Sequence, residues 1–222
     1  VSYTMTDASG TNSAEDGAQG AIYFGQPAPT IVSPLDWSQA HRGNIMFDYR
    51  FDSKDPVKYL RNFGFNVLFA FNSGHPYTRI FTPVGGATSA YDAGVSYMND
   101  TRDRQSTEPI NSSTTPWVYR TDIRLDKTFK IGKFETTVYC RIYNLFNRKN
   151  VANVYQLTGS AEDDGILSDP QRAKNLISTW GEDFVDMYRA INLKNGQAYW
   201  DVVGGQIYEH PRQIFFGIRF SY

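Results

Sequence analysis

The sequence predicts an all-β fold, namely a segment of an antiparallel transmembrane β-barrel with about six strands. Six stretches alternate apolar and polar residues with the period of two that places successive side chains on opposite faces of a strand. The longest stretches exceed the usual strand of about 5–6 residues and reach the ~9–11 residues that cross a bilayer. Long connections follow the first, third and fifth strands and short ones follow the second and fourth, as in membrane barrels.

Composition excludes several classes of protein. The chain has 222 residues and a formal net charge of −1, which provides no general attraction for nucleic acid or anionic lipid. Its single cysteine, Cys140, excludes an intrachain disulfide and a cysteine metal cluster. No run of 18 apolar residues would form a transmembrane helix. The three histidines lack the spacing of metal ligands, and we expect no catalytic residue, no cofactor and no metal site.

The first half of the chain contains three expected strands, at 1–6, 38–52 and 62–76. In the third of these, Phe or Val recurs at every second position. The first connection, at about 7–37, is rich in Gly, Ser, Ala and Pro and is expected to form a long external loop. The second connection is short and polar, and it contains Pro56, which breaks strand pairing.

The central element is a hairpin whose arms are expected at 117–131 and 134–147, with a tight turn at Gly132. One face carries charges of both signs, and we predict that it lines a water-filled barrel lumen. The alternative use of these charges as acid–base groups is disfavoured, because no nucleophile accompanies them. Together with one residue of a final strand at 212–222, the predicted lumen-facing residues are Arg120, Asp122, Arg124, Asp126, Arg141 and Arg219.

The opposite face of the hairpin and of the final strand is apolar and is expected to contact lipid. Its members are Ile123, Leu125, Val138, Ile142, Ile214, Phe216, Ile218 and Phe220. Cys140 lies on the same face and is interpreted as a small hydrophobic residue. Aromatic residues near the loop-side strand ends are expected to form an interfacial girdle, with ligand stacking as the alternative use. These aromatic residues are Trp37, Tyr77, Trp117, Phe146 and Tyr155.

Two further long external loops are expected at about 78–116 and 148–211. In the latter, Asp169 suits a helix N-cap and Pro170 suits the first helical position, which predicts a helix of about 10–20 residues. Gly181 weakens this helix by about 1 kcal/mol. The apolar stripe is expected to pack on its own loop rather than on another surface. Its residues at helical spacing are Ala173, Leu176, Ile177, Trp180, Phe184, Met187 and Ile191.

Three polar motifs in the loops have both a functional and a structural interpretation. Asn99 and Asn111 match the glycan-acceptor pattern, which also occurs by chance. The acidic run 162–164 lacks the spacing of a helix–loop–helix calcium site, so a solvated loop is favoured. His75 and His210 would lie at the barrel mouth, where they are interpreted as ordinary polar residues rather than as contacts for a metal chelate.

Several stretches resemble the C-terminal barrel portion of TonB-dependent outer-membrane receptors, especially the large transporters of Bacteroidota-like bacteria. The matching stretches are PLDWSQAHRGNI (34–45), FNSGHPYT (71–78), PWVYRTDIRLDKTFKI (116–131), YNLFNRKNVANVYQLTG (143–159) and PRQIFFGIRFSY (211–222). The most specific part is NLFN followed by a closing strand with a terminal aromatic residue. Tyr222 stands where Phe is more usual, and either aromatic resembles the signal that the barrel-assembly machinery reads.

The resemblance implies a barrel of about 22 strands in the outer membrane of a Gram-negative bacterium. It also implies an N-terminal plug, energy from the TonB complex, a surface lipoprotein partner and the import of a scarce nutrient, whether a metal chelate, a glycan or a peptide. Because six strands leave edges that a bilayer does not tolerate, we expect the plug and the remaining strands to lie before Val1 or on a partner chain.

The alternative function is a passive or structural outer-membrane barrel, such as an adhesin or a scaffold in an envelope complex. A plug and a TonB box in the same molecule would favour import, and their absence would favour this alternative. An enzyme is disfavoured, because the sequence shows no set of residues that would act together in catalysis.

Overall fold

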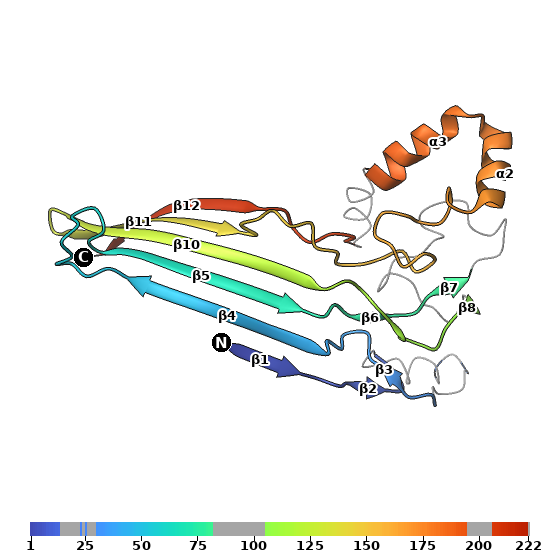
Figure 1. Ribbon diagram of the computed structural model, residues 1–222, viewed down its shortest axis with the longest axis horizontal. Coiled ribbons are helices and arrows are strands. Elements are labelled where there is room, and N and C mark those ends of the chain that lie inside the picture. The colour runs from blue at the N-terminus through green and yellow to red at the C-terminus, as the bar shows by residue number, and fades with distance from the viewer. Residues whose placement is uncertain (14–22, 24, 26–29, 82–104, 195–205, 222) are drawn as a thin grey trace.

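The computed structural model describes residues 1–13, 23, 25, 30–81, 105–194 and 206–221. Its main feature is a six-stranded antiparallel sheet in the order β1-β4-β5-β10-β11-β12, so that the strands of the sheet follow one another in sequence (Figure 1). The strands are β1 (Ser2–Met5), β4 (His41–Arg50), β5 (Phe63–Asn72), β10 (Val118–Ile131), β11 (Phe134–Tyr143) and β12 (Gln213–Ser221). The predicted six strands and the mostly antiparallel β fold are confirmed, with most strands ending a few residues earlier than expected.

Strand register places the apolar and charged residues on opposite faces of this sheet. Ile123 of β10 lies directly opposite Val67 of β5 and Ile142 of β11. Ile142 in turn lies opposite Ile214 of β12. Directly opposed residues of antiparallel strands point to the same face, so apolar rows run unbroken from β5 to β12. Arg124, one position after Ile123, belongs to a row on the other face.

The connections at the two ends of the sheet differ in length (Figure 1). At one end a two-residue turn joins β10 to β11, and its Gly132 has a φ of 60°, which glycine adopts without strain. Residues 51–62 join β4 to β5 at the same end. The described parts of 6–40, 73–117 and 144–212 lie at the opposite end. The predicted alternation of long and short connections is therefore confirmed.

Short strand pairs form within the first two long connections. The pairs are β2 (Ser9–Gly10) with β3 (Ser33–Pro34), β6 (Pro76–Tyr77) with β9 (Ser113–Thr114), and β7 (Ile80–Phe81) with β8 (Gln105–Ser106). A strand of two residues is too short to show alternation, which explains why the sequence pattern did not predict these pairs. We call the described residues of 73–117 and 144–212 the loop unit.

The predicted helix is present in the third long connection. Helix α2 (Pro170–Trp180) begins after Asp169, whose carboxylate accepts hydrogen bonds from the backbone N–H groups of Gln171 and Arg172. It ends at Gly181, which has a φ of 87°. Two shorter segments follow, helix α3 (Asp183–Tyr188) and the π-helix η2 (Arg189–Lys194). No helix in the described part of the chain is long and apolar enough to cross a membrane.

The expected apolar stripe is only partly correct. The break at Gly181 changes the direction of the chain (Figure 1), so one continuous stripe does not form. Trp180, Met187 and Ile191 are exposed, whereas Leu176 and Phe184 pack against a buried pair, Ile166 and Tyr188. A second buried cluster in the loop unit contains Tyr155, Ile207 and Tyr208.

Candidate functional site

The apolar face of the main sheet is exposed. Phe216 and Ile218 of β12 keep 78% and 60% of their surface exposed, and Val138 of β11 keeps 39%. Among the described residues these side chains therefore do not pack in a closed core against a second sheet. Exposed apolar patches of this extent mark surfaces that meet another apolar medium. Contact with lipid remains a prediction for the eight residues named above for this face.

Aromatic rings gather on this face where the strands enter the loop unit. The His41 ring stacks on Trp117 with centroids 5.7 Å apart, and its Nδ1 lies 2.8 Å from the hydroxyl of Tyr3. Trp117 also stacks on Tyr119 and Phe71, at 6.1 and 6.4 Å. We call these five residues the aromatic belt. Amphipathic rings of this kind are enriched where a protein crosses from hydrocarbon to water.

A lysine interrupts the apolar face near its other end, where Phe129 and Ile131 continue the same face of β10. Lys127 of β10 lies opposite Phe63 and Val138, in an apolar row. Its ammonium group donates hydrogen bonds to the carbonyls of Tyr59 and Arg61 in the short connection. The aliphatic part of the side chain thus covers apolar surface while the charge reaches polar groups at the end of the sheet.

The expected aromatic girdle is wrong at two positions. Tyr77 and Tyr155 keep 5% and 1% of their surface exposed, because both are buried in the loop unit. Trp37, Trp117 and Phe146 are exposed. Of the five predicted residues, Trp117 belongs to the aromatic belt. A position near a strand end therefore does not distinguish a residue of the aromatic belt from a buried residue of the loop unit, because large rings occur in both places.

The polar face carries a ladder of ion pairs, as its alternating charges indicate. Asp126 of β10 accepts a 2.6 Å hydrogen bond from Arg50 of β4 and lies 3.6 Å from Arg124 on its own strand. Asp122 lies 3.1 Å from Arg120 and accepts a hydrogen bond from the backbone N–H of Asn144. Each carboxylate is nearly buried by the long side chains beside it.

The remaining predicted lumen residues lie on this same face. Arg124 places its guanidinium 5.3 Å from the ring of Tyr139. Arg141 of β11 donates a hydrogen bond to the hydroxyl of Tyr143. Arg219 of β12 is exposed opposite Thr137. The structure therefore brings the six predicted residues onto one face, although their contact with a lumen remains a prediction.

The chemistry of this face is that of a hydrated wall. Asp122 and Asp126 are paired with arginines, and no group of three or more His, Cys, Asp or Glu that would hold a metal occurs in the part of the chain that the structure describes. Mixed charges with water between them suit a polar lumen.

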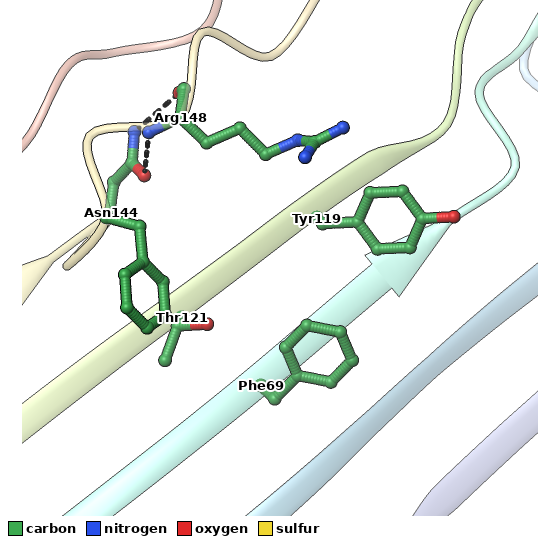
Figure 2. Close-up of a pocket in the computed structure, with 6 residues that line it drawn as sticks. Phe69, Tyr119, Thr121, Asn144 and Arg148 are labelled. Carbon is green, nitrogen blue, oxygen red and sulfur yellow. Dashed lines mark hydrogen bonds between the residues drawn. The ribbon is translucent and has the colours of Figure 1, made fainter.

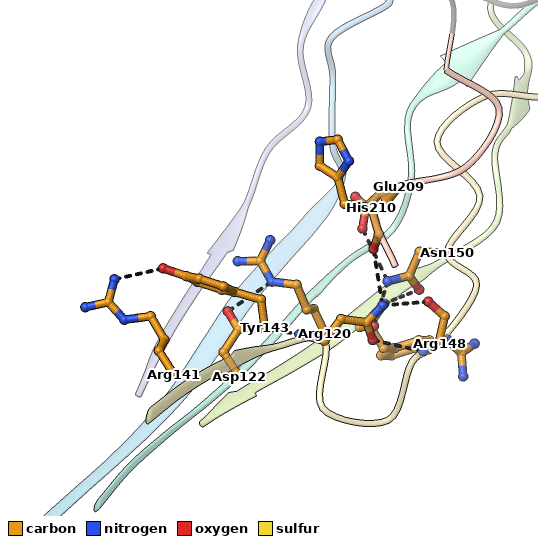
Figure 3. A network of polar contacts seen from close by, with 10 residues as sticks. Arg120, Asp122, Arg141, Tyr143, Arg148, Asn150, Glu209 and His210 are labelled. Atoms are coloured by element: carbon orange, nitrogen blue, oxygen red, sulfur yellow. Dashed lines mark hydrogen bonds and ion pairs between the residues drawn. The ribbon is translucent and has the colours of Figure 1, made fainter. Parts of the chain in front are cut away.

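Three asparagines hold the rim where the sheet meets the loop unit. Figure 3 shows one of them, Asn150, beside Glu209. Asn144 and Asn147, of the NLFN sequence, have φ of 52° and 50°, a backbone region that asparagine tolerates better than most residues. The Asn144 side chain accepts from the N–H of Arg148 and donates to the carbonyls of Arg148 and His210. Asn147 accepts from the N–H of Arg212, which joins the end of β11 to the start of β12.

Asn150 completes this rim. Its side chain accepts from the backbone N–H of Tyr119 at 3.2 Å and donates to the carbonyl of the same residue at 2.9 Å, so it pairs with β10 as a strand residue would. It also donates to Glu209, and only 2% of its surface is exposed. These roles were not predicted from the sequence, although repeated Asn residues, as within 144–150, often occupy left-handed backbone positions.

The acidic run in the third loop is used for folding. Asp164 is fully buried, accepts a 2.6 Å hydrogen bond from the hydroxyl of Tyr188 and caps the N–H of Ile166. Burial raises the pKa of Asp164, and the Tyr188 hydrogen bond partly offsets that rise. Asp163 accepts from the N–H of Gly165 within its own turn. These carboxylates serve separate backbone sites, which disfavours calcium binding. The expectation of a solvated loop is wrong at Asp164, which is fully buried.

Two other loop motifs also have structural roles. Asn111 is buried, and its amide nitrogen donates to the carbonyl of Pro34 and to Asp36, so this side chain is not available to a glycan. His75 has its two ring nitrogens within hydrogen-bond distance of the carbonyls of Pro76 and Ala152. His210 is exposed. Asn99 and Tyr222 lie outside the described residues.

A groove of about 620 Å³ opens beside the rim (Figure 2). Its lining comes from the apolar face of β5 and β10 and from the segment after β11, and consists of Phe69, Tyr119, Thr121, Asn144, Phe146 and Arg148. Figure 2 shows Arg148 extending toward Tyr119, and its guanidinium carbon lies 5.0 Å from the centre of that ring. Phe146 is 75% exposed.

Comparisons of this chain with family models, with curated proteins and with solved structures give no match. Function is therefore inferred from the residues themselves and from their geometry.

Proposed function

We propose that this chain is the C-terminal barrel portion of a TonB-dependent outer-membrane receptor that imports a scarce nutrient. The observation that carries the proposal is the main sheet, whose apolar face is exposed, whose opposite face is charged and whose long connections all leave from one end. A soluble sheet with this exposed apolar area would aggregate, whereas a sheet in a bilayer requires it. The family resemblance of the NLFN segment and the closing strand supports the same assignment.

The charged face would line the lumen of the barrel. Arginines outnumber carboxylates among the six predicted residues, and each of the two carboxylates is engaged by an arginine. Such a wall stays hydrated and presents hydrogen-bond donors to an N-terminal plug or to a polar nutrient. The nutrient class proposed is a metal chelate, a glycan or a peptide, with contacts in the external loops and the plug.

Further strands would complete the barrel. Among the described residues, β1 and β12 each pair with a main-sheet neighbour on one side only. Unpaired backbone groups in hydrocarbon cost several kcal/mol each, so both edges require partners, from the same polypeptide or from another. The proposed partners are therefore outer-membrane lipid, the remaining strands and plug, the barrel-assembly machinery, the TonB complex and a surface lipoprotein.

The test uses the full natural polypeptide in its own membrane. We expect it in the outer-membrane fraction, with an intact mass several times 25.2 kDa and a plug-like domain before the barrel. We expect a deletion strain to lose growth on one limiting nutrient among ferric chelates, oligosaccharides and oligopeptides, and wild-type uptake to stop when a protonophore removes the proton gradient.

Two outcomes would contradict the proposal. A membrane protein of only 25.2 kDa with no partner supplying strands would exclude the larger barrel. A complete barrel whose loss changes adhesion or envelope integrity, with uptake unaffected and no plug, would support the alternative of a passive or structural barrel.

A further inference from the structure

The groove beside the rim combines an apolar floor with a cationic edge. Phe69 and Thr121 are direct partners across β5 and β10 on the apolar face, and the Phe69 ring stacks on Tyr119 at 6.4 Å. Phe146 adds a second, exposed apolar wall. The guanidinium group of Arg148 lies over the ring of Tyr119. The groove thus changes from apolar to charged along one direction, from the sheet toward the loop unit.

The cationic edge is not neutralised by the residues around it. Within the described residues, neither Arg148 nor Arg212 forms a salt bridge. Arg212 donates to the carbonyl of Leu145, one residue before Phe146, so a second guanidinium lies next to the groove wall. The nearby carboxylates are engaged elsewhere, since Glu162 pairs with Lys149 and Glu209 accepts from Asn150. The edge therefore favours an anionic partner.

We propose that this groove binds one phosphorylated membrane lipid, with the phosphate at Arg148 and an acyl chain against Phe69, Thr121 and Phe146. Charge complementarity selects the phosphate, because a guanidinium forms paired, charge-assisted hydrogen bonds with phosphate oxygens. The apolar walls select the acyl chain, and about 620 Å³ accommodates a phosphate group and part of one chain. The aromatic belt on the same face marks the level at which headgroups meet acyl chains.

This inference rests on the proposed membrane location but not on nutrient import. It differs from binding of a free anion, because a water-soluble phosphate would gain nothing from the apolar walls. It also differs from a general lipid contact of the sheet, because this part of the apolar face has, among the described residues, two guanidinium groups that form no salt bridge.

The experiment measures lipid binding to the full natural polypeptide, purified in an uncharged maltoside detergent. Native mass spectrometry counts bound molecules during titration with phosphatidic acid, with a diacylglycerol of the same chains, or with inorganic phosphate. We expect one tightly bound phosphatidic acid, with weaker binding of the diacylglycerol and of inorganic phosphate. Arg148→Gln and Phe146→Ala should each weaken phosphatidic acid binding, the former by ~10-fold or more.

Matched controls are exposed residues of the same types away from the groove. Arg189→Gln and Phe216→Ala should leave binding unchanged. Equal effects of Arg148→Gln and Arg189→Gln would overturn the proposal, as would equal binding of diacylglycerol. Competition by inorganic phosphate at equal concentration would assign a free-anion site instead. Since Phe146 and Arg148 are both exposed, a heat-dependent gel shift confirms that each variant still folds.

The same preparation separates this inference from the proposed function. A polypeptide absent from the outer membrane would remove the proposed function and the lipid site together. A polypeptide that lies in the outer membrane and imports its nutrient, but binds no phosphatidic acid, would remove the lipid site alone.

Discussion

The main sheet and the loop unit differ in how far they bury their own apolar side chains. In the sheet, large apolar residues such as Phe216 and Ile218 remain 78% and 60% exposed. In the loop unit, Tyr155 and Ile166 keep 1% and 0% of their surface exposed although both lie outside its helices and strands. The loop unit therefore contains its own core, whereas the sheet needs an apolar medium to cover it.

Because of this difference, the stability of the sheet should depend on the surrounding medium more than the stability of the loop unit does. Apolar burial contributes about 25 cal/mol per Å², so the loop unit gains its stabilisation within the chain. The sheet gains hydrogen bonds within the chain, and under the proposed function it gains the burial of its outer face from the membrane. Substitutions should act on folding in the first region and on membrane insertion in the second.

Ile166→Ala should have the largest effect on folding of the loop unit. Ile166 is fully buried beside Tyr188, so truncation leaves a cavity and should destabilise this region by about 2–5 kcal/mol. Hydrogen–deuterium exchange of 150–194 in the full natural polypeptide measures the loss. Ile218→Ala is the matched control on the sheet, 60% exposed, and should leave that exchange unchanged. Similar losses in both variants would remove the distinction between the regions.

For membrane insertion, by contrast, the larger effect should come from a substitution on the sheet, Phe216→Arg. If this face contacts lipid as proposed and Phe216 lies near its middle, arginine there costs ~2–4 kcal/mol. Phe215→Arg is the control, since Phe215 lies on the charged face opposite Arg141. The fraction of polypeptide that reaches the folded, heat-modifiable membrane form measures the effect. Equal insertion of Phe216→Arg and the wild type would place this face outside the hydrocarbon.

Asn144→Ala should affect the boundary between the two regions. It removes three side-chain hydrogen bonds from a buried site and places alanine at a φ of 52°, which together should cost about 1–3 kcal/mol. Asn144→Gly keeps the backbone conformation and should cost less. Hydrogen exchange at the start of β12 and at 148–152 measures both. Identical results for Ala and Gly would show that the backbone conformation contributes nothing.

Asp169→Ala should have a smaller and local effect. The Asp169 carboxylate caps two N–H groups of α2, and loss of an N-cap typically costs about 1 kcal/mol. Glu182→Ala is the control, because Glu182 precedes α3 without a side-chain cap hydrogen bond. Exchange rates of the first turn of α2 measure the difference, and equal rates in the two variants would contradict the capping role.

The last test concerns the pH dependence of the loop unit. Because burial raises the pKa of Asp164 above its ordinary 3.8, its stabilising contribution is complete below that value and is lost as pH rises through the folded-state pKa. Asp164→Asn should remove this loss, measured as amide protection in 150–194 corrected for intrinsic exchange. Tyr188→Phe removes the contact that offsets burial and should move the loss to higher pH. Identical pH slopes in wild type and Asp164→Asn would contradict this assignment.

The sheet was largely predictable from sequence because its signal is periodic. Alternation fixed the faces of Ile123 and Arg124 before any contact was known, and Asp169 with Pro170 located the start of α2. Burial in the loop unit has no such period. Tyr77 enters its core from the two-residue strand β6 and Tyr155 from an irregular segment, so their position near strand ends suggested a girdle instead.

The rim and the groove were not predictable for a different reason. Asn150 acts through pairing with Tyr119, a contact between segments that the turn after β11 brings together. Arg148 becomes part of a groove only because Asn144 reverses the chain beside β5 and β10. Such juxtapositions depend on backbone conformation at single residues, which neither composition nor spacing specifies.

The distance along the strand between Lys127 and Trp117 can be compared with the thickness of a membrane. The first interrupts the apolar face near the end with the short connections, where its ammonium group reaches backbone carbonyls, and the second belongs to the aromatic belt at the other end. At about 3.4 Å per residue they lie about 34 Å apart along the strand, which a barrel tilt of about 40° reduces to about 26 Å of height. That height equals the thin hydrocarbon layer of about 25 Å around outer-membrane barrels. In a thicker bilayer the lysine would be drawn into hydrocarbon, so under the proposed function this pair matches the protein to one membrane thickness and disfavours thicker ones.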